Sequence, residues 1–355
     1  MAKLKSLRNK IDDIDNTIVK LLNDRAKIVL DIKEAKKDDR LKVYSPTRER
    51  EILKRLGKLN TGPFPGDALI ALYKEILSTS RSLQQPLKIA YFGPPATFTH
   101  LAARRQFGAS AEYVPESTIK AIFESVMRGK AQYGVVPIEN STEGVVNYTL
   151  DMFMDSDLNI TSEVMLPIRH NLMSKTGKAT GIKKIYSHPQ PIAQCRGWLE
   201  EHYPGVPLIG GMSTASAAKR VARETSSAAI ASELAADIYK LKFIAKGIED
   251  YKNNFTRFLV IAKDYLPRTG NDKTSIMFSV KDKPGALHKI LEHFAKHKIN
   301  LTKIESRPSK RKAWEYIFFV DMQGHVEDLK VRKAIDAVKK ECLYLKVLGS
   351  YPLAD

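Results

Sequence analysis

Apolar side chains recur at alternating steps of three and four positions in the first part of the chain: Leu4, Leu7, Ile11, Ile14, Ile18, Leu21, Ile28, Ile32 and Ala35. This heptad pattern predicts one helix with an apolar seam, roughly 50 Å long at 1.5 Å per residue. Too little sequence follows before Pro86 to cover the seam within one chain, so we expect it to pair with a second copy. Arg25 also occupies a seam position, where its charge is unfavourable unless an anion meets it.

Beyond Pro86 the pattern changes to short apolar runs that alternate with helical periodicity. Strands are expected at 87–92, 113–114, 133–137, 161–167, 185–187, 228–231 and 258–262, and helices at 119–128 and 215–224. Such alternation is typical of an α/β fold. A return of the last strand toward the first would give two lobes with a cleft between them.

The pattern changes again at Lys273. Strands are expected at 275–281, 299–306, 314–321 and 345–351, and helices at 284–297 and 326–340. The order βαββαβ indicates a ferredoxin-like unit, which we expect to be a separate module. The predicted domains are therefore 1–85, 86–266 and 273–355.

Thr256 and Arg257 stand at the start of the apolar run 258–262. Ligands of open α/β sheets bind at strand ends where connections reverse. A hydroxyl beside a guanidinium there can offer a proton donor and a fork for a carboxylate. The alternative is a polar strand edge with Arg257 in solvent.

Four polar clusters follow or precede predicted elements, at 93–100, 137–144, 187–191 and 213–216. The first is a turn that leads into a helix, with Thr97 or Thr99 as the cap and free backbone N–H groups that can bind an anion, and the last is another helix cap. Each cluster alone would be an ordinary turn, and His188 alone an ordinary structural histidine.

Composition narrows the class of protein. The 355 residues are 43% hydrophobic and 28% charged, as in soluble proteins of two or three domains. Two distant cysteines argue against a disulfide framework or a zinc site and fit a reducing cytosol. We expect a cytoplasmic protein, because no signal peptide or transmembrane run is evident. The net charge of +18 suits anionic partners, either nucleic acid or small polycarboxylates.

The segment from Leu7 to Gln85 resembles the all-helical chorismate mutases, intertwined dimers whose site is a cage of cations. The matching positions are Arg8, Arg25, Lys36, Arg48, Glu49, Ser80 and Gln84. The rearrangement of chorismate to prephenate is pericyclic, so it needs positioning and charge stabilisation but no nucleophile, metal or cofactor.

The resemblance also implies a role for each of these residues. Carboxylates would be clamped by Arg8 from the other subunit, Arg25 and Arg48, with support from Ser80. The ether oxygen would accept from Lys36 and Gln84, and Glu49 would take the ring hydroxyl. Ser45 departs from an acidic residue found in some members. The alternative from the residues alone is a basic coiled coil that tolerates one buried arginine.

Residues from Leu87 to about Lys263 resemble prephenate dehydratases, which have two lobes like the periplasmic binding proteins. The strongest matches are 135–146, 186–195 and 254–260. The resemblance implies loss of CO₂ and hydroxyl from prephenate, with Thr256 as proton donor and Arg257 as carboxylate clamp. The cleft would be lined by Thr99, Glu139, Asn140, Ser141, Ser213 and Thr214. Ala96 replaces the family's usual glycine.

Two motifs in the last part of the chain are informative: 284–287, with small residues that let a ligand approach the backbone, and 304–308. They resemble the signature of the ACT domains of prephenate dehydratases, which bind phenylalanine between paired domains. The implied ligand residues are Gly285, Ala286, Leu287, Asn300, Leu301, Glu305 and Ser306. A helix start and a strand end are the alternative.

Together the segments predict a bifunctional enzyme that acts on chorismate and prephenate and is inhibited by L-phenylalanine. A homodimer or homotetramer is expected, without nucleic-acid or membrane partners. A ligand-responsive nucleic-acid regulator is the second hypothesis, although no helix-turn-helix pair or basic-aromatic interleaving is evident. A solute-binding protein would require a signal peptide.

Overall fold

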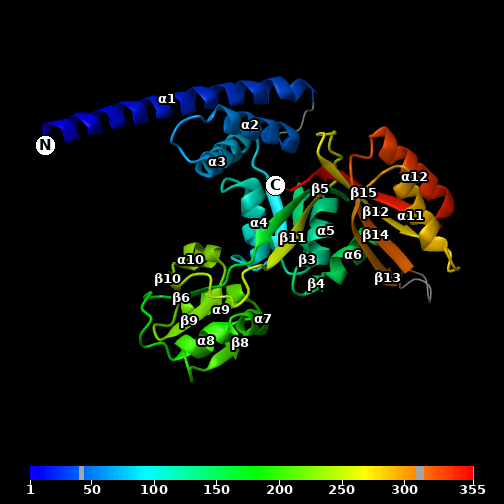
Figure 1. Cartoon of the computed structure of the whole chain (residues 1–355). Coiled ribbons are helices and arrows are strands. Elements are labelled where there is room, and N and C mark those ends of the chain that lie inside the picture. Colours follow the sequence, from blue (N-terminus) through cyan, green and yellow to red (C-terminus); the bar gives the residue numbers. More distant parts are fainter. Residues whose placement is uncertain (40–43, 309–315, 355) are drawn as a thin grey trace. The chain divides into compact units, whose positions relative to one another are not determined.

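The structure is a computed structural model that describes residues 1–39, 44–308 and 316–354, with side chains for all of these except 36–39. Its contacts divide the chain into two units (Figure 1). The helical unit comprises Met1–Leu87 with Phe107–Glu112, and the larger unit comprises Lys88–Gln106 with Tyr113–Asp355.

The helical unit contains α1 (Ala2–Asp39), α2 (Pro46–Leu59) and α3 (Gly66–Gln84). The Ser45 side chain caps α2 by accepting from the Arg48 N–H, and Pro46 opens the helix. The long first helix is confirmed. Its seam stays exposed along most of its length, at Leu4, Leu7, Ile11, Ile14, Ile18, Leu21, Ile28 and Ile32. No helix among the described residues is long and apolar enough to cross a bilayer.

The first lobe of the larger unit has a sheet in the order β2-β1-β3-β11-β5, with β4 paired to β3. Its strands are β1 (Lys88–Phe92), β2 (Glu112–Glu116), β3 (Tyr133–Asn140), β4 (Gly144–Val145), β5 (Asn159–Pro167) and β11 (Phe255–Ala262). Its helices are α4 (Phe98–Phe107), α5 (Ile119–Met127) and α6 (Asn147–Met154). The last strand does return to this lobe, where it lies antiparallel between β3 and β5.

The second lobe lies between β5 and β11 in sequence, and its sheet has the order β10-β6-β9-β7-β8. Its strands are β6 (Asn171–Ser174), β7 (Lys184–Ser187), β8 (Leu208–Gly210), β9 (Ser227–Ala231) and β10 (Lys242–Ala245). Its helices are α7 (Pro189–Gln194), α8 (Arg196–His202), α9 (Thr214–Val221) and α10 (Glu233–Tyr239). The two-lobed α/β prediction is confirmed, although β6, β8 and β10 were not predicted.

The C-terminal part forms a four-stranded antiparallel sheet in the order β13-β14-β12-β15, which we call the ACT sheet. Its elements are β12 (Asp272–Ser279), α11 (Ala286–Lys296), β13 (Leu301–Pro308), β14 (Tyr316–Gln323), α12 (Leu329–Glu341) and β15 (Tyr344–Pro352). This βαββαβ order confirms the ferredoxin-like prediction. The predicted start of β14 at Trp314 lies outside the described residues.

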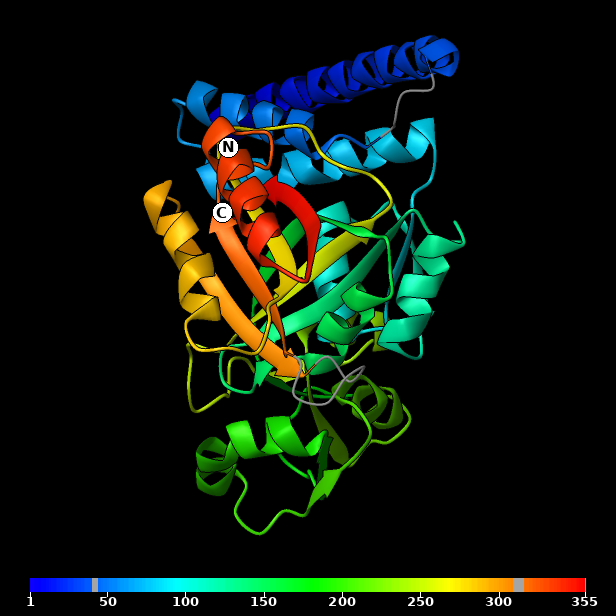
Figure 2. The ribbon, with the colours of Figure 1, turned by 90° about the vertical axis from the view of Figure 1, so that its right-hand side faces the viewer.

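Both faces of the ACT sheet make apolar contacts. One face packs against α11 and α12 through residues such as Ile290 and Val331. The other face contributes Met277, Phe319 and Leu348 to the hydrophobic core of the first lobe. In Figures 1 and 2 the sheet accordingly lies between its own helices and that lobe. The sequence predicted a separate module, but one hydrophobic core continues from the first lobe into the ACT sheet.

A close backbone approach in this core occurs at Gly349, on β15. A Cβ at this position would lie 2.2 Å from the carbonyl oxygen of Ile160 on β5, and its φ of +150° is unfavourable for other residues. Glycine is therefore needed where β15 crosses β5.

We predict that Gly349→Ala destabilises the larger unit by about 3 kcal/mol or more, since overpacking and backbone strain add. Gly270→Ala is the matched control: its φ is +89°, but nothing lies within 4 Å of the added Cβ. It should cost only about 1 kcal/mol of strain. Chemical denaturation, followed by circular dichroism, would measure both; equal costs would contradict the packing argument.

Candidate active sites

Three residues of the predicted mutase site gather in the helical unit. The Arg25 guanidinium, from α1, donates a hydrogen bond to Ser80 Oγ on α3. Ser80 in turn donates to the carbonyl oxygen of Ile76 at 2.7 Å, which fixes its hydroxyl. One helical turn beyond Ser80, the Oε1 atom of Gln84 is buried without a partner among the described residues. The cation of Arg25 on α1 therefore meets a face of α3 that carries a hydroxyl and an amide.

Glu49 has a buried partner that sequence analysis missed. Arg81 donates to Glu49 Oε1 and to the carbonyl oxygen of Phe107, and its guanidinium lies 5.0 Å from the centre of the Tyr44 ring. Burial raises the pKa of Glu49, although Arg81 and Arg25 act to lower it. Charge balance could have indicated Arg81 from the sequence, because a carboxylate that is largely buried on α2 requires a cation nearby.

Arg8 and Arg48 do not join this group within one chain. Arg8 is exposed on α1, and Arg48 is exposed and pairs with Glu51 at 3.0 Å. Lys36 belongs to α1, but its side chain lies outside the described ones. The described side chains of one helical unit thus supply only part of a cation cage.

In the larger unit, the strand geometry separates Thr256 from Arg257. Successive side chains of a strand point to opposite faces of the sheet. On β3 the residue paired with Thr256 is Asn140, and the residue paired with Arg257 is Glu139. Thr256 and Asn140 therefore share one face, and Arg257 and Glu139 share the other. The structure does not bring Thr256 and Arg257 into one site.

The amide of Asn140 is held in a defined orientation. Its Oδ1 accepts from the Thr142 N–H at 3.0 Å, the Thr142 hydroxyl at 2.6 Å and the Glu143 N–H at 3.0 Å. Because two of these donors are backbone groups, Nδ2 must face the other way. There it donates to Thr256 Oγ1 and to Asn254 Oδ1, each at 2.8 Å. The Thr256 oxygen is thus an acceptor, and no acceptor for its own proton is found among the described residues.

The network continues into the second lobe. Asn254 Nδ2 donates to Gln194 Oε1 at 3.3 Å, and the same oxygen lies 2.8 Å from His170 Nε2. His170 is 1% exposed, its Nδ1 is without a partner among the described residues, and burial lowers its pKa. A neutral imidazole with its proton on Nε2 satisfies this geometry. Sequence analysis missed Gln194 and His170, which stand outside the quoted polar clusters.

The remaining predicted cleft residues lie at turns and helix starts. Ser141 Oγ accepts from the Phe255 N–H at 3.0 Å, beside the network. Thr99 is buried in the first turn of α4. Ser213 caps α9 in a capping box with Ser216, and Thr214 is the first residue of that helix. The hydrogen-bond network around Thr256 does not include Thr99, Ser213 or Thr214.

The turn before α4 confirms the predicted cap and shows why glycine suits the position that Ala96 occupies. Thr97 Oγ1 accepts from the His100 N–H at 3.3 Å, as an N-cap does. Ala96 has a φ of +74°, a conformation that glycine adopts without steric cost. Its carbonyl oxygen accepts from Ser232 of the second lobe at 2.8 Å.

Arg257 is fully engaged on the opposite face, where it is only 8% exposed. Its Nε donates to Glu163 at 2.8 Å, and its two terminal nitrogens donate to Asp321 at 2.6 Å and to Tyr351 at 3.0 Å. Burial alone would lower the pKa of Arg257, but Tyr351, Asp321 and Glu163 hold it above its ordinary value. Neither a carboxylate clamp nor a solvated strand edge describes this residue.

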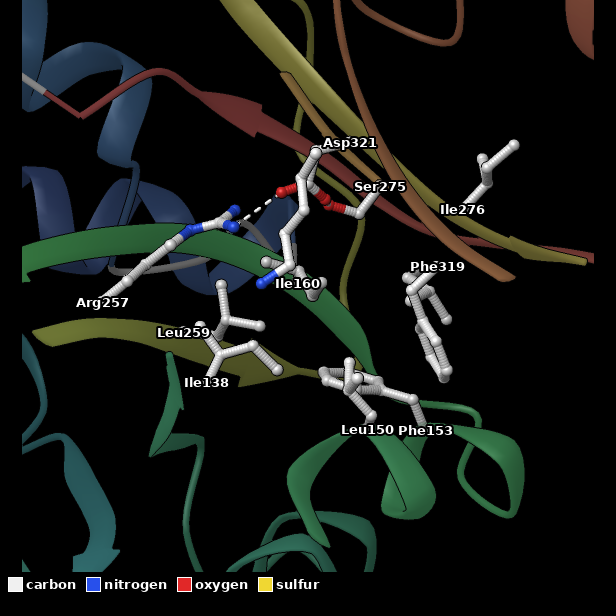
Figure 3. Close-up of a pocket in the computed structure, with 12 residues that line it drawn as sticks. Ile138, Leu150, Phe153, Ile160, Arg257, Leu259, Ser275, Ile276, Phe319 and Asp321 are labelled. Carbon is white, nitrogen blue, oxygen red and sulfur yellow. Dashed lines mark hydrogen bonds and ion pairs between the residues drawn. The ribbon is translucent and has the colours of Figure 1, made fainter. Parts of the chain in front are cut away.

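Figure 3 shows the Arg257–Asp321 pair beside a small cavity between the first lobe and the ACT sheet. The cavity measures ≈ 20 Å³ and is lined mostly by apolar residues such as Leu150, Phe153 and Phe319. Sites for small molecules typically have 300–1,000 Å³, so this cavity is a packing defect of the shared core. A larger cavity of ≈ 500 Å³ lies on α5 and α6. Its charged lining residues are Lys120, Glu124, Asp151 and Asp155, and three carboxylates to one cation do not suit a dianionic ligand.

The residues predicted to bind the ligand phenylalanine lie on or next to two elements of the ACT region. Gly285 has a φ of +78° and precedes α11, which begins with Ala286 and Leu287. Asn300 precedes β13, which carries Leu301, Glu305 and Ser306. Side chains alternate along β13, so Glu305 is half-buried and Ser306 is exposed. Among the described residues, no group of three or more His, Cys, Asp or Glu side chains could hold a metal ion.

Family models match all three parts of the chain: chorismate mutase type II at residues 7–85, prephenate dehydratase at 89–265 and the ACT domain at 274–340. The bifunctional chorismate mutase/prephenate dehydratase of Aquifex aeolicus is 52% identical, with 100% of this chain and 99% of that protein covered. The chain belongs to this bifunctional family.

Solved structures agree with this membership over the larger unit. Prephenate dehydratase from Arthrobacter aurescens, in complex with L-Phe, is 35% identical with a TM-score of 0.70, covering 76% of this chain and 91% of that chain. A structure described as GqqA, a quorum quenching acylase, also has a TM-score of 0.70 at 28% identity, covering 75% of this chain and 98% of that one. The shared fold alone therefore does not determine the activity, which has to be argued from the residues of the site.

Proposed function

We propose that the chain rearranges chorismate to prephenate in domain 1–85 and converts prephenate to phenylpyruvate in domain 86–266. Domain 273–355 would bind L-phenylalanine and inhibit the second step. Membership of the bifunctional family supports both activities. The observation that carries the second reaction is the amide of Asn140, which donates to Thr256 Oγ1 and leaves the threonine proton free.

This hydrogen bond addresses how a weak acid such as threonine could act as the donor. As the ring carboxylate of prephenate leaves as CO₂, the electrons of the C–C bond that held it enter the ring. The C–O bond to the ring hydroxyl then breaks. The Thr256 proton goes to that leaving oxygen, which departs as water, and solvent later restores the proton. Negative charge that develops on Oγ1 meets the Asn140 N–H, which is already in place.

Arg257 does not serve as an anchor in this scheme, because protein groups occupy its guanidinium. We propose that the carboxylates are bound by Ser141 and by the starts of α4 and α9. The hydroxyls of Thr99, Ser213 and Thr214 lie at those helix starts, together with backbone N–H groups that suit anions.

In the mutase, Arg25, Ser80 and Gln84 would bind one end of chorismate, and Glu49 the ring hydroxyl. Lys36 and Arg48 complete the proposed set, with Arg8 from a second copy. The exposed apolar seam of α1 supports a dimer, since contact with a second seam would bury it. A homotetramer is compatible with this contact, and sedimentation velocity measures the state directly.

Phenylalanine is proposed as the effector because the Arthrobacter aurescens prephenate dehydratase was solved in complex with L-Phe. In this chain, the residues proposed to bind it are Gly285, Ala286, Leu287, Asn300, Leu301, Glu305 and Ser306. A cytoplasmic location is proposed from Cys195 and Cys342, which are both free thiols.

Two reciprocal variants test the bifunctional assignment. Thr256→Ala should reduce phenylpyruvate formation from prephenate at least 10²-fold and spare the mutase, because it removes only the donor. Arg25→Ala should reduce prephenate formation from chorismate to a similar degree and spare the dehydratase. Turnover of each substrate, with products separated, measures both rates. Phenylpyruvate formation that persists in Thr256→Ala would contradict the donor assignment.

Asn140→Asp tests the activating hydrogen bond. The carboxylate can still accept from Thr142 and Glu143 but cannot donate to Thr256, so we expect kcat for prephenate to fall about 10²–10³-fold. Ser141→Ala, one residue along, is the matched control and should mainly raise KM. A wild-type kcat for Asn140→Asp would show that the amide N–H does not assist proton transfer.

A further inference from the structure

Two ion pairs join the ACT sheet to the strands that carry the proposed donor and its activating amide. Arg257 follows Thr256 on β11, and Glu139 precedes Asn140 on β3. By strand alternation both charged residues point away from the Thr256 face, toward the ACT sheet. Arg257 pairs with Asp321, and Glu139 pairs with Lys303. Both partners belong to the ACT sheet.

The first connection is a buried network. Asp321 on β14 accepts from Arg257 at 2.6 Å and from Ser275 on β12 at 2.5 Å. Tyr351 on β15 accepts from Arg257 at 3.0 Å and lies 2.7 Å from the Ser275 hydroxyl. Lys273 on β12 adds two 2.9 Å bonds to Glu163, the remaining partner of Arg257. Strands β14 and β15 therefore contact one guanidinium on β11, and β12 binds the partners of that guanidinium.

The second connection starts at β13. Lys303 pairs with Glu139 at 2.7 Å, and Arg307 pairs with Asp151 of α6 at 3.3 Å. Glu305 and Ser306, proposed to contact phenylalanine, lie between these two cations on the same strand. The ligand-binding segment is thus fixed to the first lobe on both sides.

These connections meet at a hydrogen bond that is sensitive to register. Thr256 and Asn140 are paired across β11 and β3, and the pairing shifts by one residue directly after Arg257. A displacement of either strand alters the 2.8 Å bond from Asn140 Nδ2 to Thr256 Oγ1. Displacements of about 1 Å at a reacting group can cost 10²-fold in rate.

We propose that Asp321 and Lys303 are positioning residues for dehydration. From the ACT sheet they hold Arg257 and Glu139, and through these they hold the strand pair that carries Thr256 and Asn140. A ligand that shifts β13 therefore changes the dehydratase rate through these two pairs. This inference rests on the proposed dehydratase function, and its regulatory part rests on phenylalanine as the effector.

Charge exchange at the second pair tests the idea in protein that should fold, because Glu139 is 38% and Lys303 14% exposed. The variants are Lys303→Glu, Glu139→Lys and the two together, with L-phenylalanine and prephenate as probes. Each single variant should lower kcat for prephenate about tenfold and leave KM within twofold. Each should also weaken maximal inhibition by phenylalanine while its calorimetric Kd stays within threefold. The double variant should recover kcat and inhibition.

Asp321→Asn tests the first pair, with Asp328→Asn as the matched control. Asp328 also pairs with an arginine in the ACT region, Arg268 at 3.1 Å, but that arginine is 58% exposed. Asp321→Asn should show the same split between kcat and KM, whereas Asp328→Asn should behave as wild type. Mutase turnover by the same chain, circular dichroism and the stoichiometry of phenylalanine binding report whether each variant is folded.

Three results would overturn the proposal: wild-type kcat and inhibition in all the charge-changing variants, a double exchange no better than its single variants, or inhibition that changes only in step with Kd. If the wild type bound no phenylalanine, the effector assignment would fail, and the kcat arms would still decide the positioning role. If the wild type did not convert prephenate, the proposed function itself would fail.

Discussion

The alternation of side chains along β3 and β11 is the constraint on which the site depends. It places Thr256 and Asn140 on one face of the sheet and Arg257 and Glu139 on the other. The first face can then serve chemistry, because its polar groups are aligned by backbone donors. The second face can serve contact with the ACT sheet. Neighbouring residues in one motif thus have different tasks, since a strand cannot point both in the same direction.

Burial explains why the second face is so densely paired. A guanidinium removed from water is costly unless carboxylates and hydrogen bonds replace its hydration. Arg257 has Glu163, Asp321 and Tyr351, and the apolar core continues around them from the first lobe into the ACT sheet. Loss of one partner from such a buried pair typically costs 3–5 kcal/mol. Catalytic and regulatory regions are therefore one packed body.

The sequence predicted the architecture well, because heptads, strand–helix alternation and the βαββαβ order are local patterns. It also predicted the elements that carry Arg25, Ser80 and Thr256. It missed Arg81, Gln194 and His170, whose roles arise from contacts between distant segments. It joined Thr256 to Arg257 because adjacency in a motif was taken for adjacency in a site. The shared core was missed because ferredoxin-like units commonly fold as separate modules, and contacts such as the close approach at Gly349 arise between segments that are distant in sequence.

We propose that the ACT sheet holds the strand pair on which dehydration depends. Hydrogen–deuterium exchange of the whole chain, with and without saturating L-phenylalanine, is the sharpest test. We expect altered exchange at 138–142 and 254–258 as well as on β13 and β14. Changes confined to 273–355, in a protein whose dehydratase activity is nevertheless inhibited, would contradict it.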